Sequence, residues 1–148
     1  MAHKAMDIAK WFINRAMEDV EMVGGEFMTN IKLQKMLYFA QGCYGAMADK
    51  RLFEEDIVHW MHGPAVEKVF EAYAHWGDKG MDKREICPNF DNQTKKILEE
   101  VYSVYGEYSA LGLRNFSQTH KPMQETENCQ VIPFERIVEF FKSELVEF

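Results

Sequence analysis

The positions of apolar residues between residues 30 and 47 predict one long helix at the centre of the fold. Residues three and four positions apart share a face of a helix, and here that spacing is apolar. The apolar face consists of Leu33, Met36, Leu37, Ala40, Cys43, Tyr44 and Met47. Thr29 stands at the N-cap position, where its hydroxyl can accept from a free amide of the first turn. A second, narrow row holds Gln34, Tyr38, Gln41 and Gly45, so little of this helix is left for water.

Two glycines lie inside this helical pattern, Gly42 and Gly45. Each costs about 1 kcal/mol relative to alanine within a helix. Their presence indicates that another backbone comes close to the helix there. An earlier helix end at Gly42 is the alternative.

Other stretches combine helical spacing with start or stop residues. Asp91 and Ser109 are suitable N-caps, and Gly24 and Gly106 are typical helix ends. Pro64 is placed at the first position of a helix, where its missing N–H costs least. The expected helices cover residues 6 to about 22, 64–76, 92–105, 110 to about 117, and 133 onward.

Residues 56–62, with the sequence DIVHWMH, are the best strand candidate because they are rich in β-branched and aromatic residues. Residues 84–86 are a candidate second strand, and residues 119–129 are expected to form a polar loop. Short helices without a regular alternation of strands argue against a Rossmann-like fold. We therefore predict a mainly α protein: one compact domain over residues 1–148, with about six helices and a small β-strand or hairpin.

The composition limits the classes of partner. The 148-residue chain has 17 lysines and arginines against 24 aspartates and glutamates, a net charge of −7. Such a chain is a poor candidate for direct nucleic-acid binding, which depends on neutralising phosphates. An acidic surface suits a basic partner protein, or simply solubility. With no long apolar run and no signal peptide, and with three cysteines taken as reduced thiols, we expect a cytoplasmic protein that has no contact with membranes.

Candidate chemistry is sparse. His59 and His62, with Asp56, invite a metal hypothesis, but residues three apart on a strand point to opposite faces. Cys43 lies on the core face of its helix, where cysteines are usually inert. We therefore expect no metal, no cofactor and no catalytic residue. The alternative is a small hydrolase or transferase in which His59, His62 or His120 works with a carboxylate.

Several motifs resemble one family. Residues 32–44, KLQKMLYFAQGCY, resemble the KLQKLLYFAQ helix of the Panacea family, the antitoxin domain related to SocA and to phage-associated GepA proteins. Residues 60–66, WMHGPAV, resemble its aromatic-x-x-Gly-Pro-Val run, with Ala65 in the valine position. Residues 113–123 resemble its Leu-Ser-x-Leu-Thr-His segment, with Ser117-Gln118 placed differently and Met123 where tryptophan is usual. The resemblance extends over most of the chain.

This resemblance implies an antitoxin of a type II toxin–antitoxin system that neutralises a cognate protein toxin by direct binding. Some relatives also act as adaptors that deliver the toxin to a protease. The alternative is a phage-associated interaction protein of unassigned role. For the contact surface we choose the Gly63-Pro64 turn with Trp60 and His62, and with Thr119 and His120 near it. A strand edge beside the turn could also accept a partner strand. In the opposing interpretation, Trp60 belongs to the core and the turn only connects.

Overall fold

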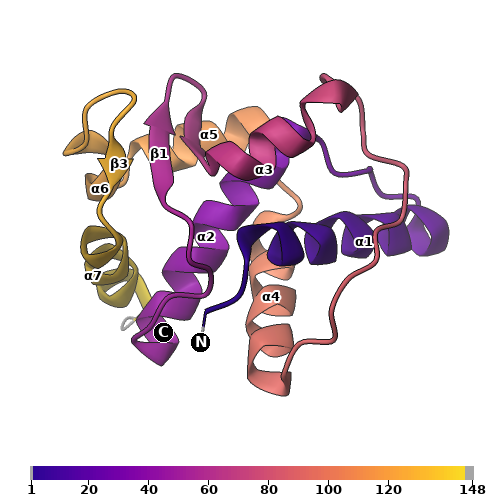
Figure 1. Ribbon diagram of the computed structural model, residues 1–148, viewed down its shortest axis with the longest axis horizontal. Coiled ribbons are helices and arrows are strands. Elements are labelled where there is room, and N and C mark those ends of the chain that lie inside the picture. The colour runs from indigo at the N-terminus through magenta and orange to yellow at the C-terminus, as the bar shows by residue number, and fades with distance from the viewer. Residues whose placement is uncertain (1, 146–148) are drawn as a thin grey trace.

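The computed structural model describes residues 2–145, and within that range it contains seven α-helices and three short strands (Figure 1). The helices are α1 (Ala5–Val23), α2 (Asn30–Ala48), α3 (Glu67–Ala72), α4 (Asn92–Tyr105), α5 (Ala110–Gln118), α6 (Lys121–Gln124) and α7 (Phe134–Leu145). The strands are β1 (Ile57–Trp60), β2 (Gly63–Ala65) and β3 (Val131–Ile132). The prediction of a mainly α fold with a small β element is confirmed.

Helix α2 lies at the centre, as predicted, with α7 on one side and α1 and α4 on the other (Figure 1). Both its apolar face and its row of Gln34, Tyr38 and Gln41 are buried. Met47 is the exception: its side chain is 55% exposed, so its expected inward position is wrong. Met47 sits in the last turn, which ends at Asp49 in a left-handed conformation.

Local signals located the helix ends well. Thr29 accepts a hydrogen bond from Lys32 N at 3.3 Å, and Ser109 accepts one from Gly112 N at 3.0 Å. Gly24 ends α1 with a φ of 76°, a conformation that glycine adopts without strain. These contacts involve residues only a few positions apart, which is why the sequence alone could indicate them.

Helix α7 explains the two glycines of α2. A Cβ atom added at Gly42 would overlap the ring of Phe141, and one added at Gly45 would lie 2.7 Å from Val138 Cγ2. The helix continues through both positions, so the alternative of an early end at Gly42 is wrong. A neighbour does pack closely there, but the expectation of a backbone is wrong, because the nearest atoms belong to α7 side chains.

Two buried glutamines of α2 hold the connecting segments. Gln41 Oε1 accepts from Leu52 N at 2.8 Å and from Phe53 N at 3.2 Å, and its amide donates to Phe53 O at 3.0 Å. Gln34 Oε1 accepts from Val66 N at 2.8 Å, directly after β2. Buried backbone groups need such partners. Gln34 therefore helps to position the β1–β2 hairpin against α2.

Replacing Gln41 by methionine is expected to destabilise the fold by about 2–4 kcal/mol, because the buried amides of Leu52 and Phe53 lose their acceptor. Urea unfolding of the purified variant measures this change. The exposed Gln93 provides the matched control, since Gln93→Met should leave the unfolding midpoint within error. Equal midpoints for the two variants would contradict the bridging role of Gln41.

The three strands form an antiparallel sheet in the order β2-β1-β3. Trp60 pairs with Gly63 across a two-residue turn, and Val58 pairs with Ala65 on one side and with Val131 on the other. The expectation that Gly63-Pro64 ends the β element and starts a helix is therefore wrong. Both residues belong to β2, and α3 begins only at Glu67.

Residues 84–86 do not form the expected second strand. The side chain of Asn14 takes the place of a strand partner: its Nδ2 donates to Glu85 O at 2.9 Å, and its Oδ1 accepts from Glu85 N at 2.8 Å. Residues 119–129 are also not entirely a loop, because they contain the short helix α6.

Candidate partner-binding surface

The tip of the β1–β2 hairpin projects an apolar side chain. Met61 is 78% exposed. Its backbone is nevertheless held, because Arg114 of α5 donates from both Nε and Nη2 to Met61 O, at 3.1 Å each. A turn fixed in this way loses little conformational freedom when a partner binds.

Aromatic rings support the tip from one side. The Trp60 ring lies 5.2 Å from that of Phe70 in an edge-on arrangement, and the His62 ring stacks on Phe70 at 5.7 Å. All three side chains are partly exposed. We call Trp60, Met61, His62 and Phe70 the hairpin surface. Trp60 is thus partly buried, so it is neither a core residue nor a fully exposed one.

Gly63 and Pro64 are buried beneath this surface. Gly63 has a φ of 110°, and a Cβ atom there would lie 3.0 Å from Lys35 Cε. These two residues shape the hairpin and are not displayed to a partner. Strand β2, at one side of the sheet, is buried along its whole length, so the strand edge beside the turn is not open to a partner strand.

A buried lysine lies under the hairpin. The side chain of Lys35 is 0% exposed, and its Nζ lies 3.0 Å from His62 Nδ1. Burial, together with the nearby Arg114, lowers the pKa of Lys35 to about 7. Burial and the charge of Lys35 also lower the pKa of His62. His62 is therefore neutral at pH 7, and its Nδ1 accepts from the lysine.

Thr119 and His120 do not join the hairpin surface. Thr119 is exposed at the end of α5, where its hydroxyl donates to Phe116 O at 2.7 Å. His120 is buried: its Nδ1 lies 2.8 Å from the Tyr38 hydroxyl, and its ring lies 4.1 Å from that of Phe140. Burial lowers the pKa of His120 to about 4. A partner would have to displace part of α7 to reach this histidine.

The histidines proposed for the hydrolase alternative have separate partners. His59 Nδ1 lies 2.6 Å from Thr126 O, whereas His62 faces Lys35 and His120 faces Tyr38. Within residues 2–144, none of the three forms a hydrogen bond with a carboxylate, and no group of three potential metal ligands occurs. In the described part of the chain, these three histidines therefore do not share a hydrogen-bonded cluster with an acid.

Two of the three cysteines lie in surroundings that disfavour a reactive thiolate. All three are free thiols, and Cys43 is buried in α2. Burial raises the pKa of Cys43 to about 12, which disfavours the reactive thiolate. Burial also raises the pKa of Cys87, whose sulfur lies 3.8 Å from Asp7 O.

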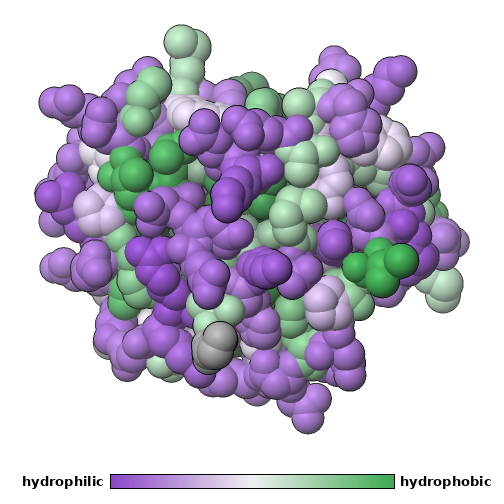
Figure 2. Space-filling view, viewed as in Figure 1, coloured by the Kyte–Doolittle hydropathy of each residue, from purple (hydrophilic) through white to green (hydrophobic). Residues whose placement is uncertain are grey.

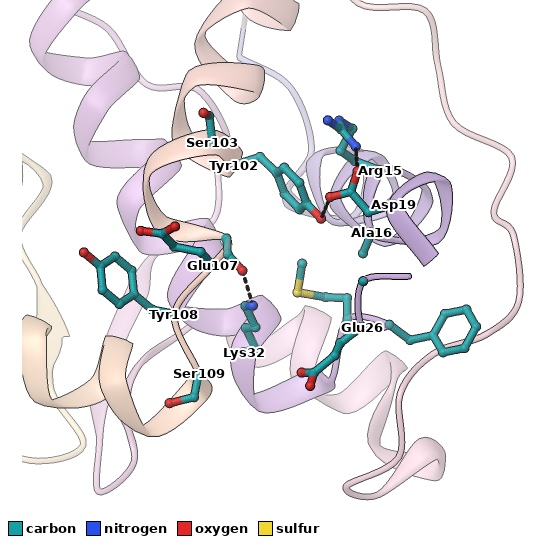
Figure 3. Close-up of a pocket in the computed structure, with 14 residues that line it drawn as sticks. Arg15, Ala16, Asp19, Glu26, Lys32, Tyr102, Ser103, Glu107, Tyr108 and Ser109 are labelled. Carbon is teal, nitrogen blue, oxygen red and sulfur yellow. Dashed lines mark hydrogen bonds and ion pairs between the residues drawn. The ribbon is translucent and has the colours of Figure 1, made fainter. Parts of the chain in front are cut away.

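A polar cavity of about 590 Å³ lies between the ends of α1 and α4 and the start of α2 (Figure 3). Three of its charged side chains, Arg15, Asp19 and Lys32, are already engaged. Lys32 Nζ donates to Gly106 O, and Tyr102 donates to Asp19 Oδ2 at 2.7 Å. The close-up shows the side chains of Tyr102 and Asp19 turned toward each other.

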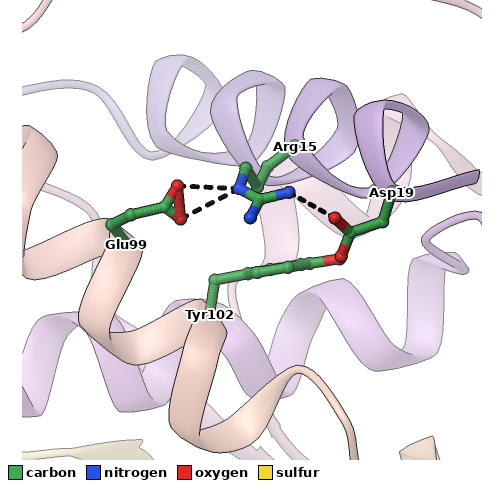
Figure 4. A network of polar contacts seen from close by, with 4 residues as sticks. All are labelled: Arg15, Asp19, Glu99 and Tyr102. Carbon is green, nitrogen blue, oxygen red and sulfur yellow. Dashed lines mark hydrogen bonds and ion pairs between the residues drawn. The ribbon is translucent and has the colours of Figure 1, made fainter. Parts of the chain in front are cut away.

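The same wall contains a four-residue network that joins α1 to α4 (Figure 4). Arg15 donates to Glu99 at 2.7 and 2.9 Å and to Asp19 at 2.6 Å, and its guanidinium lies 4.7 Å from the centre of the Tyr102 ring. Because these groups bind one another, we interpret the network as a connection between helices and not as a ligand site.

The comparison with known families places this helical chain in a class of antitoxin domains. Residues 33–123, more than half of the chain, match the family described as "Antitoxin SocA-like, Panacea domain". The chain belongs to this family. The comparisons with curated proteins and with solved structures gave no match. Within residues 2–145, every helix is too short or too polar to span a bilayer.

Sequence reasoning missed Met61, Phe70, Arg114 and Lys35. Lys35 had a detectable signal, because Ile31, Tyr38 and Gly42 share its helical row and none of them is charged. A lysine in such a row is a candidate for burial, although the charged Lys32 lies three positions before it. Arg114 had no signal, since its contact with Met61 joins segments 53 residues apart.

Proposed function

We propose that this protein is the antitoxin of a type II toxin–antitoxin system, and that it neutralises a protein toxin by binding it directly, without catalysing a reaction. The observation that carries the proposal is the family match over residues 33–123, a range that includes α2, the hairpin and α5. The partner is a protein encoded beside this chain, and its contact site is the hairpin surface.

Physical features of the hairpin surface support this assignment. Interfaces are commonly anchored by a few aromatic or other large side chains that become fully desolvated on binding. Trp60 and Phe70 provide such side chains, and the exposed Met61 can adapt to an irregular partner surface. The two hydrogen bonds from Arg114 fix the turn before the partner arrives.

The direct test is expression of the adjacent gene alone and together with this one. We expect the adjacent product to arrest growth alone, and to be tolerated and co-purified when this chain is present. Toxin levels that stay constant during rescue fit sequestration, whereas rapid loss of the toxin would favour the role of a protease adaptor. An adjacent product that is harmless alone would leave the alternative of a phage-associated interaction protein.

Replacing Met61 by serine is expected to weaken binding of the adjacent product at least tenfold without changing the melting temperature. The side chain is exposed, so the fold does not depend on it, while loss of a central anchor typically costs about 2 kcal/mol of binding. Titration calorimetry measures the affinity, after circular dichroism has confirmed the fold.

Ile86 provides the matched control for Met61, because it is 93% exposed and lies in the loop before α4. Ile86→Ser should bind as the unmodified chain does. Trp60→Ala and His62→Glu, made separately, extend the test to the half-buried members of the surface. Unchanged binding by Met61→Ser and by folded Trp60→Ala would show that the toxin contacts another surface.

A further inference from the structure

A groove with an apolar floor crosses the outer face of the small sheet. Ile57 and its partner Ile132 point into the core, each 2% exposed. The adjacent pair, Val58 and Val131, must point outward because side chains alternate along a strand. Val131 is 47% exposed, and the groove has a volume of about 470 Å³. Figure 2 shows a hydrophobic patch over β1 and β3, bordered by hydrophilic residues.

The rim of this groove is strongly acidic. We call the site the sheet groove and define it by its lining residues, Glu54, Glu55, Asp56, Val58, Val66, Glu67, Lys68 and Val131. Four carboxylates thus face one lysine. Asp56 pairs with Arg51 at 3.5 Å, and Glu55 accepts from Ala5 N at 3.0 Å. Among the described residues, Glu54 and Glu67 form no ion pair and are exposed.

The sheet groove is continuous with the hairpin surface. Val58 and Trp60 are two residues apart on β1, so they lie on the same face of the sheet. Glu67 and Phe70 are three residues apart on α3, so they share one side of that helix. Phe70 in turn contacts Trp60. One apolar strip therefore runs from Val131 to the hairpin tip, with carboxylates along the end formed by the sheet groove.

We propose that the sheet groove binds a basic segment of the toxin, with an apolar side chain over Val58 and Val131 and lysine or arginine side chains beside Glu54 and Glu67. This inference rests on the proposed function and adds the chemistry of the partner. The excess of carboxylates at the rim favours a positively charged occupant. A second copy of this chain, with its net charge of −7, would bring more negative charge to the rim, and a nucleic acid would do the same.

A model peptide tests the recognition chemistry without the toxin. The probe is a nine-residue peptide in which lysine alternates with valine, and its counterpart carries glutamate in place of lysine. We expect the basic peptide to shift the amide resonances of residues 54–58, 66–68 and 131 of the isotopically labelled chain, and the acidic peptide to shift none. Shifts that are scattered over surface acids, or confined to another region, would overturn the proposal.

Charge-reversal variants provide the quantitative test. The double variant Glu54→Lys and Glu67→Lys is expected to weaken peptide binding about tenfold. Asp78→Lys with Asp82→Lys changes the net charge by the same amount in the exposed loop after α3 and serves as the control. If both double variants weaken peptide binding equally, the effect depends on net charge alone. That result would contradict specific binding in the sheet groove.

The adjacent gene product separates this inference from the proposed function. If it binds the unmodified chain, and the reversal at Glu54 and Glu67 weakens binding no more than the loop control does, the sheet groove is not the contact and the antitoxin assignment stands. If it does not bind at all, the antitoxin assignment fails, and the peptide titration alone decides whether the groove recognises basic segments.

Discussion

Replacing Lys35 by methionine is expected to stabilise the folded chain at pH 7 by up to about 4 kcal/mol, because this lysine is buried without a carboxylate partner among residues 2–144. The pKa of Lys35 in the folded chain is lowered to about 7. In an unfolded chain a lysine has a pKa of about 10.4. Between these two values the unfolded chain binds more protons than the folded one, so the stability contributed by this site rises with pH.

The pH dependence provides the decisive measurement. The contribution of Lys35 to stability should rise from pH 7 to pH 10, by at most about 1.4 kcal/mol per unit, and it is read as the difference between the unmodified chain and Lys35→Met. The advantage of Lys35→Met should shrink over the same range. Urea unfolding at pH 7 and pH 10 measures both effects, with Lys96→Met on the exposed side of α4 as the control. Parallel curves for the Lys35→Met variant and the unmodified chain would show that Lys35 titrates as an exposed lysine does.

A buried lysine that reduces stability suggests a use beyond packing, because proteins commonly accept such costs at functional sites. Lys35 contacts His62, whose ring stacks on Phe70. The Lys35→Met variant is therefore also expected to loosen the hairpin surface. Weaker toxin binding by a more stable variant would fit that interpretation.

Replacing Gly42 by leucine is expected to unfold the protein or to destabilise it by more than about 3 kcal/mol, because overpacking a filled core forces side chains and backbone apart. The new side chain would meet the ring of Phe141, which is 2% exposed. Gly42→Ala is the graded version. Its overpacking cost of about 1–3 kcal/mol is partly offset by the better helix propensity of alanine, about 1 kcal/mol.

Two comparisons make this test specific. Gly112→Ala is the same chemical change in α5, where the new Cβ atom would lie 3.3 Å from Ser109 Oγ, and it should alter stability little. Combining Gly42→Ala with Phe141→Leu should restore part of the lost stability, since the smaller residue leaves room. Thermal unfolding of the four variants, compared with the unmodified chain, measures these changes in stability. A melting temperature that rises in Gly42→Ala, as the helix propensity of alanine alone would make it do, would mean that α7 does not pack there.

The helices were predictable because their signals are local. The hydroxyl of Thr29 acts within three residues, and the apolar spacing of α2 needs no information from elsewhere in the chain. The Gly63-Pro64 pair was ambiguous for the opposite reason. A helix start and a hairpin strand both accept this pair, and the hairpin is favoured by pairing with β1 and by the bond from Val66 N to Gln34.

The residues of the candidate site were predictable where their signals are local, and not where they depend on contacts between distant segments. Trp60 and His62 were recognised as neighbours of the turn, and the structure groups them on one partly exposed surface. The burial of His120 could not be anticipated, because the ring of Phe140 that covers it comes 20 residues later in the chain. The sheet groove was equally hidden, since it requires the pairing of Val58 with Val131.

Hydrogen–deuterium exchange of this chain, alone and with a purified, inactive form of the adjacent gene product, tests the central claim most directly. We predict a stable complex in which residues 57–65 and 131 exchange more slowly than in the free chain, while the cavity walls around Arg15 and Tyr102 do not change. Absence of a complex, or protection confined to those cavity walls, would contradict neutralisation through the hairpin surface.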